Sequence, residues 1–491
     1  MSVNEGVPPP HTLAAGRLGG AFVVFLALAA ATPLTIVATV VPDALPPIFL
    51  VLGLVLLTFA AGYTAMARRM PHAGPLYAFV ARGLGRQLGV GAAWLALLSY
   101  GALQLGLYGL VGAAVAQAGF DVPWWAAALA CWAVVALCGI MRIQVTAWLL
   151  AVLVLAEVVV IAGYSAANAL DPDGGRLSRA ALGLSLPDRT TLGVLLVTGV
   201  LTFIGFEIAA AYTEETRRRT AVYPAIIVLA VLYAGAGWAM SVAAGPGARS
   251  PELMFDLAAA RLAPWAVTLG RALVVTGLLA AMIALHQTTS RYLFALGRER
   301  VLPPGLGRTA RRTSAPRAAS LTQSVFTGAA IGAGAYAVPD PAALAERLTV
   351  GGGLGILVLL LATALAALLF LNRQPNGESA WTRFVAPGLA TVALGSLTYL
   401  ACDSVPVPEI VAASAAVLLG GLHGLALRLG SPVAYAGIGL GGAAVVVAPT
   451  SAPVVIPAQR RPGAHRPERV KNPQDGADDQ PEGRPPARRV S

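Results

Sequence analysis

Glu157, Glu207 and His286 are titratable side chains that lie inside long apolar stretches of the chain. An ionised side chain at the centre of a membrane helix costs about 2.5–3.5 kcal/mol, so these groups are expected to face the protein interior. We interpret Glu157 as a proton-coupling site, with a neutral acid hydrogen-bonded between helices as the alternative. Glu207 either carries a proton or braces the backbone beside it. His286 is a candidate proton relay or substrate contact, with helix–helix hydrogen bonding as the alternative.

Two apolar stretches are interrupted at a similar depth. The first contains Thr32-Pro33, and proline removes a backbone donor in mid-helix. The sixth contains Gly205 between Ile204 and Phe206, directly before Glu207. In inverted-repeat transporters, discontinuous helices at corresponding positions of the two halves form the substrate site. The pair therefore predicts a transport site, although Pro33 alone could be a kink packed by neighbouring helices.

A polar stripe runs along the third apolar stretch. Tyr100, Gln104 and Tyr108 are spaced four residues apart and so share one face of a helix. This face is too polar for contact with lipid. It is expected to line a cavity, or else to form a hydrogen-bonded seam between helices.

The composition indicates an all-α polytopic membrane protein. The 491 residues are 57% hydrophobic and 12% charged, whereas soluble chains carry about 25% charged residues. The net charge of +11 comes from basic residues between apolar runs, which favours membrane orientation over nucleic-acid binding. The three cysteines form no CxxC pair, and the only lysine is Lys471, so a Walker A motif is excluded. We expect no metal, no cofactor and no enzymatic constellation.

Apolar runs of about 20 residues predict twelve membrane helices. Arginines gather in alternate connections, which predicts cytoplasmic N- and C-termini. A thirteenth apolar run, 432–449, is interpreted as tail or interfacial. The expected helices are 19–40, 44–66, 88–117, 123–140, 144–168, 192–213, 221–244, 265–295, 319–338, 350–371, 384–402 and 406–428.

Four segments occur in a familiar order and spacing: 30–35 (AATPLT), 71–85 (PHAGPLYAFVARGLG), 203–207 (FIGFE) followed by Glu214-Glu215, and 289–298 (TSRYLFALGR). Over about residues 17–430 the chain resembles the amino acid–polyamine–organocation superfamily, especially actinobacterial amino acid permeases. The resemblance implies a LeuT-like core with a five-plus-five inverted repeat, broken helices 1 and 6, and two peripheral helices. The expected organisation is a cytoplasmic N-terminal segment (1–18), a transport core (19–371), peripheral helices (372–430) and a largely disordered basic tail (431–491).

The resemblance also implies where a substrate binds. Its carboxylate would meet backbone amides near Ala31 and Thr32, and its amine would meet carbonyls near Phe203 and Ile204. Phe206 would be a gate or wall. The candidate substrate-binding residues are Ala31, Thr32, Pro33, Thr35, Tyr100, Gln104, Phe203, Ile204, Gly205 and Phe206, and the candidate coupling residues are Glu157, Glu207 and His286.

The sequence departs from the family pattern in two places. Many proton-coupled relatives carry a lysine in helix 5, where this chain has Glu157. The usual glycine-rich, serine-containing break of helix 1 is replaced by Ala-Thr-Pro. The expected function is proton-coupled amino acid transport across the cell membrane. The alternatives are a polyamine or organic-amine carrier, a sensor or partner subunit without transport, and, third, a membrane enzyme.

Overall fold

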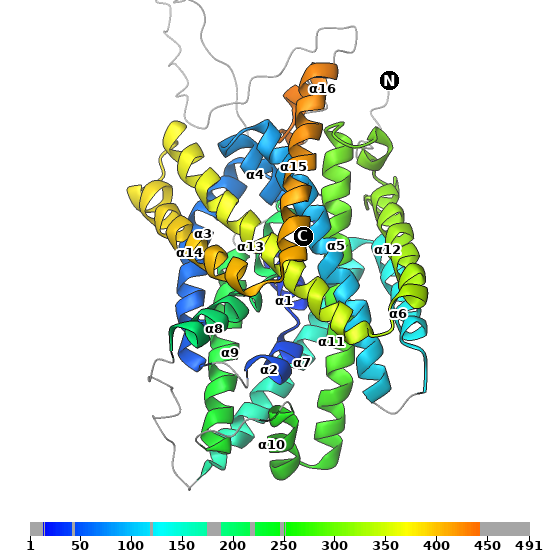
Figure 1. Ribbon diagram of the computed structural model, residues 1–491, viewed down its shortest axis with the longest axis vertical. Coiled ribbons are helices and arrows are strands. Elements are labelled where there is room, and N and C mark those ends of the chain that lie inside the picture. The colour runs from blue at the N-terminus through cyan, green and yellow to red at the C-terminus, as the bar shows by residue number, and fades with distance from the viewer. Residues whose placement is uncertain are drawn as a thin grey trace, which may run out of the picture. The chain divides into compact units, whose positions relative to one another are not determined.

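The described part of the chain folds into helices (Figure 1). The structure is a computed structural model that describes residues 13, 15–41, 45–117, 121–173, 188–216, 221–245, 250 and 252–441. Within these ranges the one extended pairing is an isolated bridge between Leu18 and Thr216. The helices are α1 (Gly20–Ala30), α2 (Pro33–Thr39), α3 (Pro46–Arg69), α4 (Pro75–Gly83), α5 (Arg86–Gln117), α6 (Trp124–Ile140), α7 (Ile143–Leu170), α8 (Arg189–Leu201), η4 (Phe206–Tyr212), α9 (Val222–Ala244), α10 (Leu253–Arg261), α11 (Pro264–Arg298), η5 (Pro304–Gly307), α12 (Arg317–Ala337), α13 (Pro341–Arg373), η6 (Trp381–Val385), α14 (Ala386–Ser404), α15 (Val407–Gly430) and α16 (Pro432–Gly437).

The helices confirm a multi-pass membrane protein. In the described part of the chain, ten helical segments are long and apolar enough to cross a bilayer. The predicted helices at 123–140 and 319–338 correspond to the shorter α6 and to α12. Most of the tail predicted from 431 lies outside the described residues, although it starts with the short helix α16. The N-terminal segment 1–18 is also largely outside them.

One helix begins well before its predicted start at residue 350. Helix α13 starts at Pro341, because the side chain of Asp340 accepts hydrogen bonds from the amides of Ala342 and Ala343. An N-cap of this kind satisfies backbone donors that the first helical turn leaves free. The charged residues Glu346 and Arg347 lowered the local hydropathy, so the apolar run alone placed the start too late.

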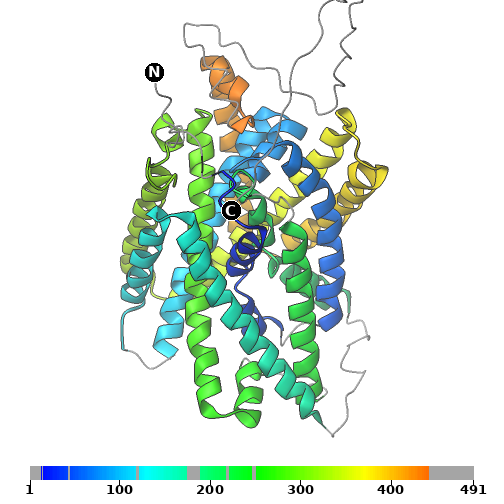
Figure 2. The same ribbon diagram turned by 180° about the vertical axis from the view of Figure 1, so that it is seen from behind.

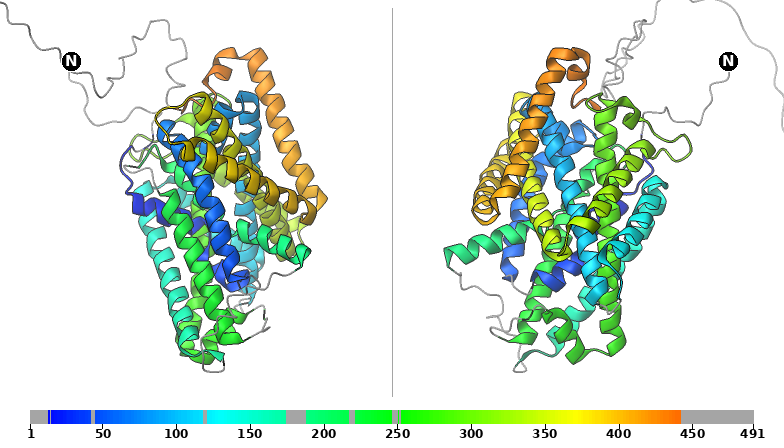
Figure 3. Two further views of the ribbon diagram at one scale, coloured as in Figure 1. Left: turned by 90° about the vertical axis from the view of Figure 1, so that its left-hand side faces the viewer. Right: turned by 45° about the vertical axis from the view of Figure 1, so that its right-hand side comes forward.

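The first and sixth membrane segments are both broken, as predicted. Thr32 separates α1 from α2 with a left-handed φ of 46°, and Gly205 precedes η4 with a φ of 125°. Figure 1 shows α1 and α2 as two separate pieces in the middle of the bundle, and Figure 2 shows the same break from behind. Helix α8 lies nearly across the direction of the long helices α9 and α11 (Figure 3).

The end of the bundle where α3, α11 and α13 finish carries many arginines, and we call it the arginine-rich end. Here Arg291 of α11 forms a two-pronged ion pair with Glu215, with Nε 2.8 Å from Oε1. About two helical turns further along α11, Arg298 pairs with Glu214 at 2.7 Å. Both pairs tie α11 to the segment that follows η4. The guanidinium of Arg291 also lies over the ring of Tyr212 at 4.3 Å.

A second cluster at this end surrounds Glu299, directly after α11. Its carboxylate contacts His72 Nε2 at 2.7 Å and accepts hydrogen bonds from the Tyr77 hydroxyl and from the amides of Gly439 and Gly441. Burial by itself favours the neutral acid, but the facing His72 and these donors hold the pKa of Glu299 below its usual range. The last described residues are thereby fastened to α4 and α11.

Removing one partner of the Arg291–Glu215 pair is expected to destabilise the protein. Both side chains are buried, so Glu215→Gln leaves a buried guanidinium without its counter-charge, at a cost of about 3–5 kcal/mol. The measurement is the thermal unfolding midpoint in detergent.

The matched control is Arg271→Gln, which breaks the exposed pair of Arg271 with Glu252 and should change stability by less than about 1 kcal/mol. The double variant Glu215→Gln/Arg291→Met should recover much of the loss, because no unpaired charge remains buried. Equal unfolding midpoints for Glu215→Gln and Arg271→Gln would show that the buried pair of Arg291 with Glu215 matters no more to stability than an exposed pair.

Candidate functional site

The two helix breaks lie against each other. A Cβ atom built on Gly205 would come within 2.8 Å of both the carbonyl oxygen of Ala27 and the amide nitrogen of Ala31. Only a residue without a side chain allows the backbones to approach so closely, and the φ of 125° also favours glycine. The end of α1 and the start of η4 therefore share one small region, which we call the double break (residues 31–32 and 202–205).

Glu207 braces the sixth segment at the double break. One carboxylate oxygen accepts a hydrogen bond from the amide of Gly205 at 2.8 Å, and the other accepts one from the hydroxyl of Tyr100 at 3.1 Å. The carbonyl oxygen of Glu207 accepts a bond from Tyr63 at 2.8 Å. Since Tyr63 lies on α3 and Tyr100 on α5, three segments meet at Glu207, through its carboxylate and its backbone carbonyl.

Tyr233 of α9 connects the two breaks. Its hydroxyl oxygen lies 3.4 Å from the carbonyl oxygen of Ala31 and 3.3 Å from that of Thr202. Each of these carbonyls belongs to a residue where a helix ends. One fully buried hydroxyl thus contacts a carbonyl of each broken segment, and a movement of either break changes this contact.

Glu157 of α7 binds the start of α2. Pro33 is the first residue of α2 and has no amide hydrogen, so Leu34 supplies the first donor of this helix. The Leu34 amide donates to Glu157 Oε2 at 3.1 Å. The other oxygen, Oε1, is buried and has no hydrogen-bond partner in the described part of the chain. It faces Gly277 of α11, where an added Cβ would lie only 2.6 Å away.

The remaining predicted residues at the double break form its walls. The amides of Ala31 and Thr32 donate to carbonyls of the preceding turn of α1. The hydroxyl oxygen of Thr35 is buried and has no partner among the described residues. Phe203 and Phe206 are buried, and the Phe206 ring packs edge-on against Phe59 with centroids 5.9 Å apart.

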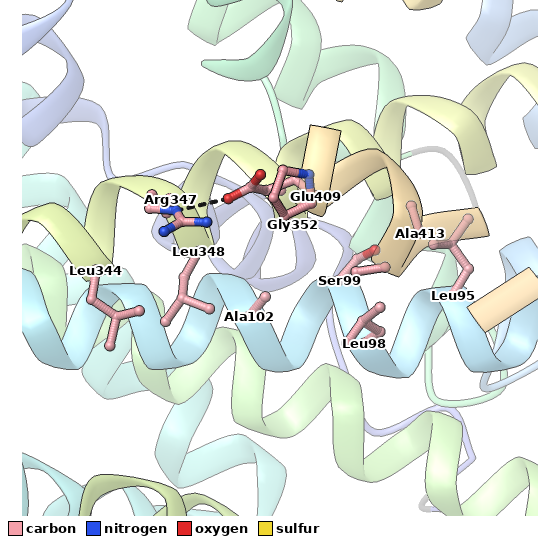
Figure 4. Close-up of a pocket in the computed structure, with 13 residues that line it drawn as sticks. Leu95, Leu98, Ser99, Ala102, Leu344, Arg347, Leu348, Gly352, Glu409 and Ala413 are labelled. Atoms are coloured by element: carbon pink, nitrogen blue, oxygen red, sulfur yellow. Dashed lines mark hydrogen bonds and ion pairs between the residues drawn. The ribbon is translucent and has the colours of Figure 1, made fainter. Parts of the chain in front are cut away.

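Ala31, Thr32, Thr202 and Phe203 of the double break are buried in this structure. A cavity of about 320 Å³ lies instead between α5, α13 and α15, and most of its lining is apolar (Figure 4). Its polar lining consists of Ser99 and of Arg347 and Glu409, which form an ion pair of 2.9 Å. No residue of either break lines this cavity.

Three predicted residues lie away from the double break. Gln104 faces α12 and accepts a hydrogen bond from Gln323 at 3.0 Å. Tyr108 lines a cavity of about 60 Å³ between α5, α6, α12 and α13. His286 contacts Ser320 of α12 at 2.9 Å, and it stands about 13 Å along α11 from Gly277, the neighbour of Glu157. The three residues of the polar stripe on α5 therefore have different surroundings, and of these only Tyr100 contacts Glu207.

Sequence reasoning missed several residues that shape the site. Tyr63 is the one tyrosine of α3 and Tyr233 is one of two in α9, and their spacing gave no signal. Arg291 stood inside the segment 289–298 that carried the family resemblance, but it was given no role. The sequence did contain a signal for the ion pair of Arg291. An arginine lies one turn beyond Gln287 in a long apolar stretch, and two adjacent acids, Glu214 and Glu215, lie elsewhere in the chain.

Replacing Gly205 is expected to damage the double break. Gly205→Ala places a Cβ against α1 in a backbone conformation that L-residues rarely adopt, with a strain of about 1–3 kcal/mol before any clash. The unfolding midpoint in detergent should fall. The control is Gly101→Ala on α5, where an added Cβ meets nothing within 4 Å and helix propensity predicts a gain of about 0.5–1 kcal/mol. A Gly205→Ala variant as stable as Gly101→Ala would show that the breaks are not in close contact.

Residues 13–440 match the family described as amino acid permease. No curated protein matches the chain. Among solved structures, the chain is similar to one described as the substrate-bound outward-open state of a Na⁺-coupled sialic acid symporter, with 14% identity and a TM-score of 0.49 over 78% of this chain and 90% of that chain. Because the family match spans most of its length, the chain belongs to the amino acid permease family, whose members are membrane transporters rather than enzymes.

Proposed function

We propose that this secondary transporter moves an amino acid across the cytoplasmic membrane by alternating access, with a proton as the coupling ion. The observation that carries the proposal is Glu157. Its carboxyl group is buried, and one oxygen holds the first amide of α2 while the other has no partner within the described residues. It forms no ion pair there either. A carboxyl group in this setting is suited to gain and lose a proton.

Protonation of Glu157 would act on the position of α2. An ionised carboxylate accepts a strong, charge-assisted hydrogen bond from the Leu34 amide, whereas the neutral acid accepts a weaker one. Proton binding therefore loosens α2 from α7, and proton release tightens the contact. Because α2 begins at the double break, this contact couples the proton to the geometry of the substrate site.

Glu207 has a different role in this proposal. Both of its oxygens already accept hydrogen bonds, from Gly205 and Tyr100, so it maintains the break in the sixth segment. This favours a zwitterionic amino acid over a polyamine, which would require free carboxylates for its several amines. We place the substrate amine near the carbonyls of Phe203 and Ile204 and its carboxylate at the α1–α2 junction, where the Thr35 hydroxyl has no partner in the described chain.

The ends of the bundle suggest how access alternates. From the arginine placement we infer that the arginine-rich end faces the cytoplasm. That end is closed by the buried pairs of Arg291 with Glu215 and Arg298 with Glu214. The pair of Arg271 with Glu252, on α11 and just before α10, is instead more than half exposed. In our proposal, opening towards the outside separates this exposed pair, and opening towards the inside follows once substrate and proton are bound.

Transport into proteoliposomes tests the proposal. The purified chain is reconstituted, and uptake of a panel of labelled amino acids and amines is measured with and without an inward proton gradient. We expect gradient-stimulated uptake of an amino acid. Glu157→Gln keeps an acceptor for the Leu34 amide but cannot exchange a proton, so the stimulation should fall at least tenfold, a loss of about 1.4 kcal/mol of coupling.

Substrate exchange without a gradient separates coupling from folding. Glu157→Gln should retain exchange, and the control Glu346→Gln, at an exposed acid of α13, should leave both uptake and exchange unchanged. Stimulation that persists in Glu157→Gln would remove Glu157 as the coupling site. Uptake of polyamines alone would establish the organic-amine carrier, and substrate binding without any flux would establish a sensor.

A further inference from the structure

A second candidate site lies at the arginine-rich end, outside the double break. The connection from α11 to α12 and the end of α6 enclose a cavity of about 630 Å³. Its polar lining is basic or hydroxylic, and no acidic side chain belongs to it. The polar lining residues are Arg308, Thr309, Arg311, Arg312, Thr313 and Arg317.

The four arginines of this cavity are not neutralised by the protein. All four are exposed, and none forms an ion pair with an acid of the described chain. Elsewhere at the same end, Arg291 and Arg298 each have a carboxylate partner. Four like charges around one cavity repel each other, so an anion of more than one charge is the ligand that relieves the repulsion.

The backbone holds this loop in a defined shape. The Ala310 amide donates to the Ala315 carbonyl at 2.9 Å, and the Ser314 amide donates to the Ala310 carbonyl at 2.8 Å. Ser314 adopts a left-handed φ of 56°, and the Thr313 hydroxyl oxygen accepts from the Ala315 amide at 3.3 Å. Arg311 and Arg312 therefore belong to a closed turn, which lowers the entropy lost when they bind a ligand.

Helix α12 adds to the positive potential. It begins at Arg317, and its N-cap Pro316 provides no side-chain hydrogen bond to the first turn. The amino end of a helix of 21 residues carries partial positive charge, and an arginine placed there is unfavourable unless an anion is near. Phosphate groups bind such helix ends through the free backbone amides.

The surface beside the cavity is apolar and faces outward. Leu321 lines the cavity and is exposed, and Val325, one turn further along α12, is more than two-thirds exposed. Ile140 closes the other side at the end of α6. Helices α6 and α12 lie side by side at one edge of the bundle in both Figure 1 and Figure 2. Acyl chains of a lipid can cover this edge while its headgroup occupies the cavity.

We propose that this cavity binds the phosphodiester headgroup of an anionic phospholipid, with its acyl chains along the α6–α12 edge. A phospholipid headgroup and a free phosphate anion both present phosphate oxygens to the arginines. The apolar edge beside the cavity favours the lipid. Cardiolipin, with two phosphodiesters, should bind more tightly than phosphatidylglycerol, with one. Phosphatidylcholine, which has no net charge, should bind least.

Thermal unfolding of the full chain in detergent tests the site. Cardiolipin and phosphatidylglycerol are expected to raise the unfolding midpoint in a saturable way, and phosphatidylcholine is not, because a ligand of the folded state stabilises it. In Arg311→Gln/Arg312→Gln the lipid concentration that gives half the shift should rise at least tenfold. These residues are exposed, so the midpoint without lipid should match that of the original chain.

The control carries the same change of charge elsewhere. Arg383→Gln/Arg428→Gln removes two arginines that lie on η6 and α15, and the half-maximal lipid concentration should change less than twofold. Equal effects of the two double variants would overturn the proposal in favour of general charge attraction. Inorganic phosphate at millimolar concentration that reproduces and displaces the lipid effect would identify a free anion as the occupant and overturn the lipid assignment.

Discussion

Backbone groups inside a bilayer have no water to bond with, and this constraint shapes the centre of the protein. Each helix break frees amides and carbonyls in a place where an unpaired polar group is costly. The chain resolves this with side chains from other helices. Glu157 accepts the first amide of α2, Glu207 accepts the amide of Gly205, and Tyr233 contacts a carbonyl at each break. The same side chains that allow the breaks to exist also determine their shape.

The two carboxylates are consequently not equivalent. Glu207 has both oxygens engaged and lies two residues from the amide that it holds, so it stabilises its own segment. Glu157 belongs to a different helix from the amide that it accepts, and one of its oxygens has no partner among the described residues. A change of charge on Glu157 alters the contact between two helices, whereas a change on Glu207 alters one local turn. This difference is the reason we propose coupling for Glu157 and bracing for Glu207.

Charge is also distributed unequally between the ends of the bundle. At the arginine-rich end, buried pairs and the Glu299 cluster connect α11 with α4, with the segment after η4 and with residues 439–441. The pKa of Glu214 is held below its usual range there, because the hydrogen bonds and charge of Arg298 outweigh the effect of burial. Buried pairs of this kind must separate for this end to open, and they lose their partners only when the helices part.

The sequence by itself determined the membrane class, the positions of both helix breaks and the depth of the two acids. These follow from hydropathy, from Pro33 and from Gly205, which act within a few residues of their own position. Only the tertiary structure decided which amide each acid binds, and it separated His286 and Gln104 from the double break by turning them towards α12. It also paired Arg291 with Glu215. A side chain's neighbours across helices depend on the rotation and packing of both helices, and the order of residues along one helix does not contain that information.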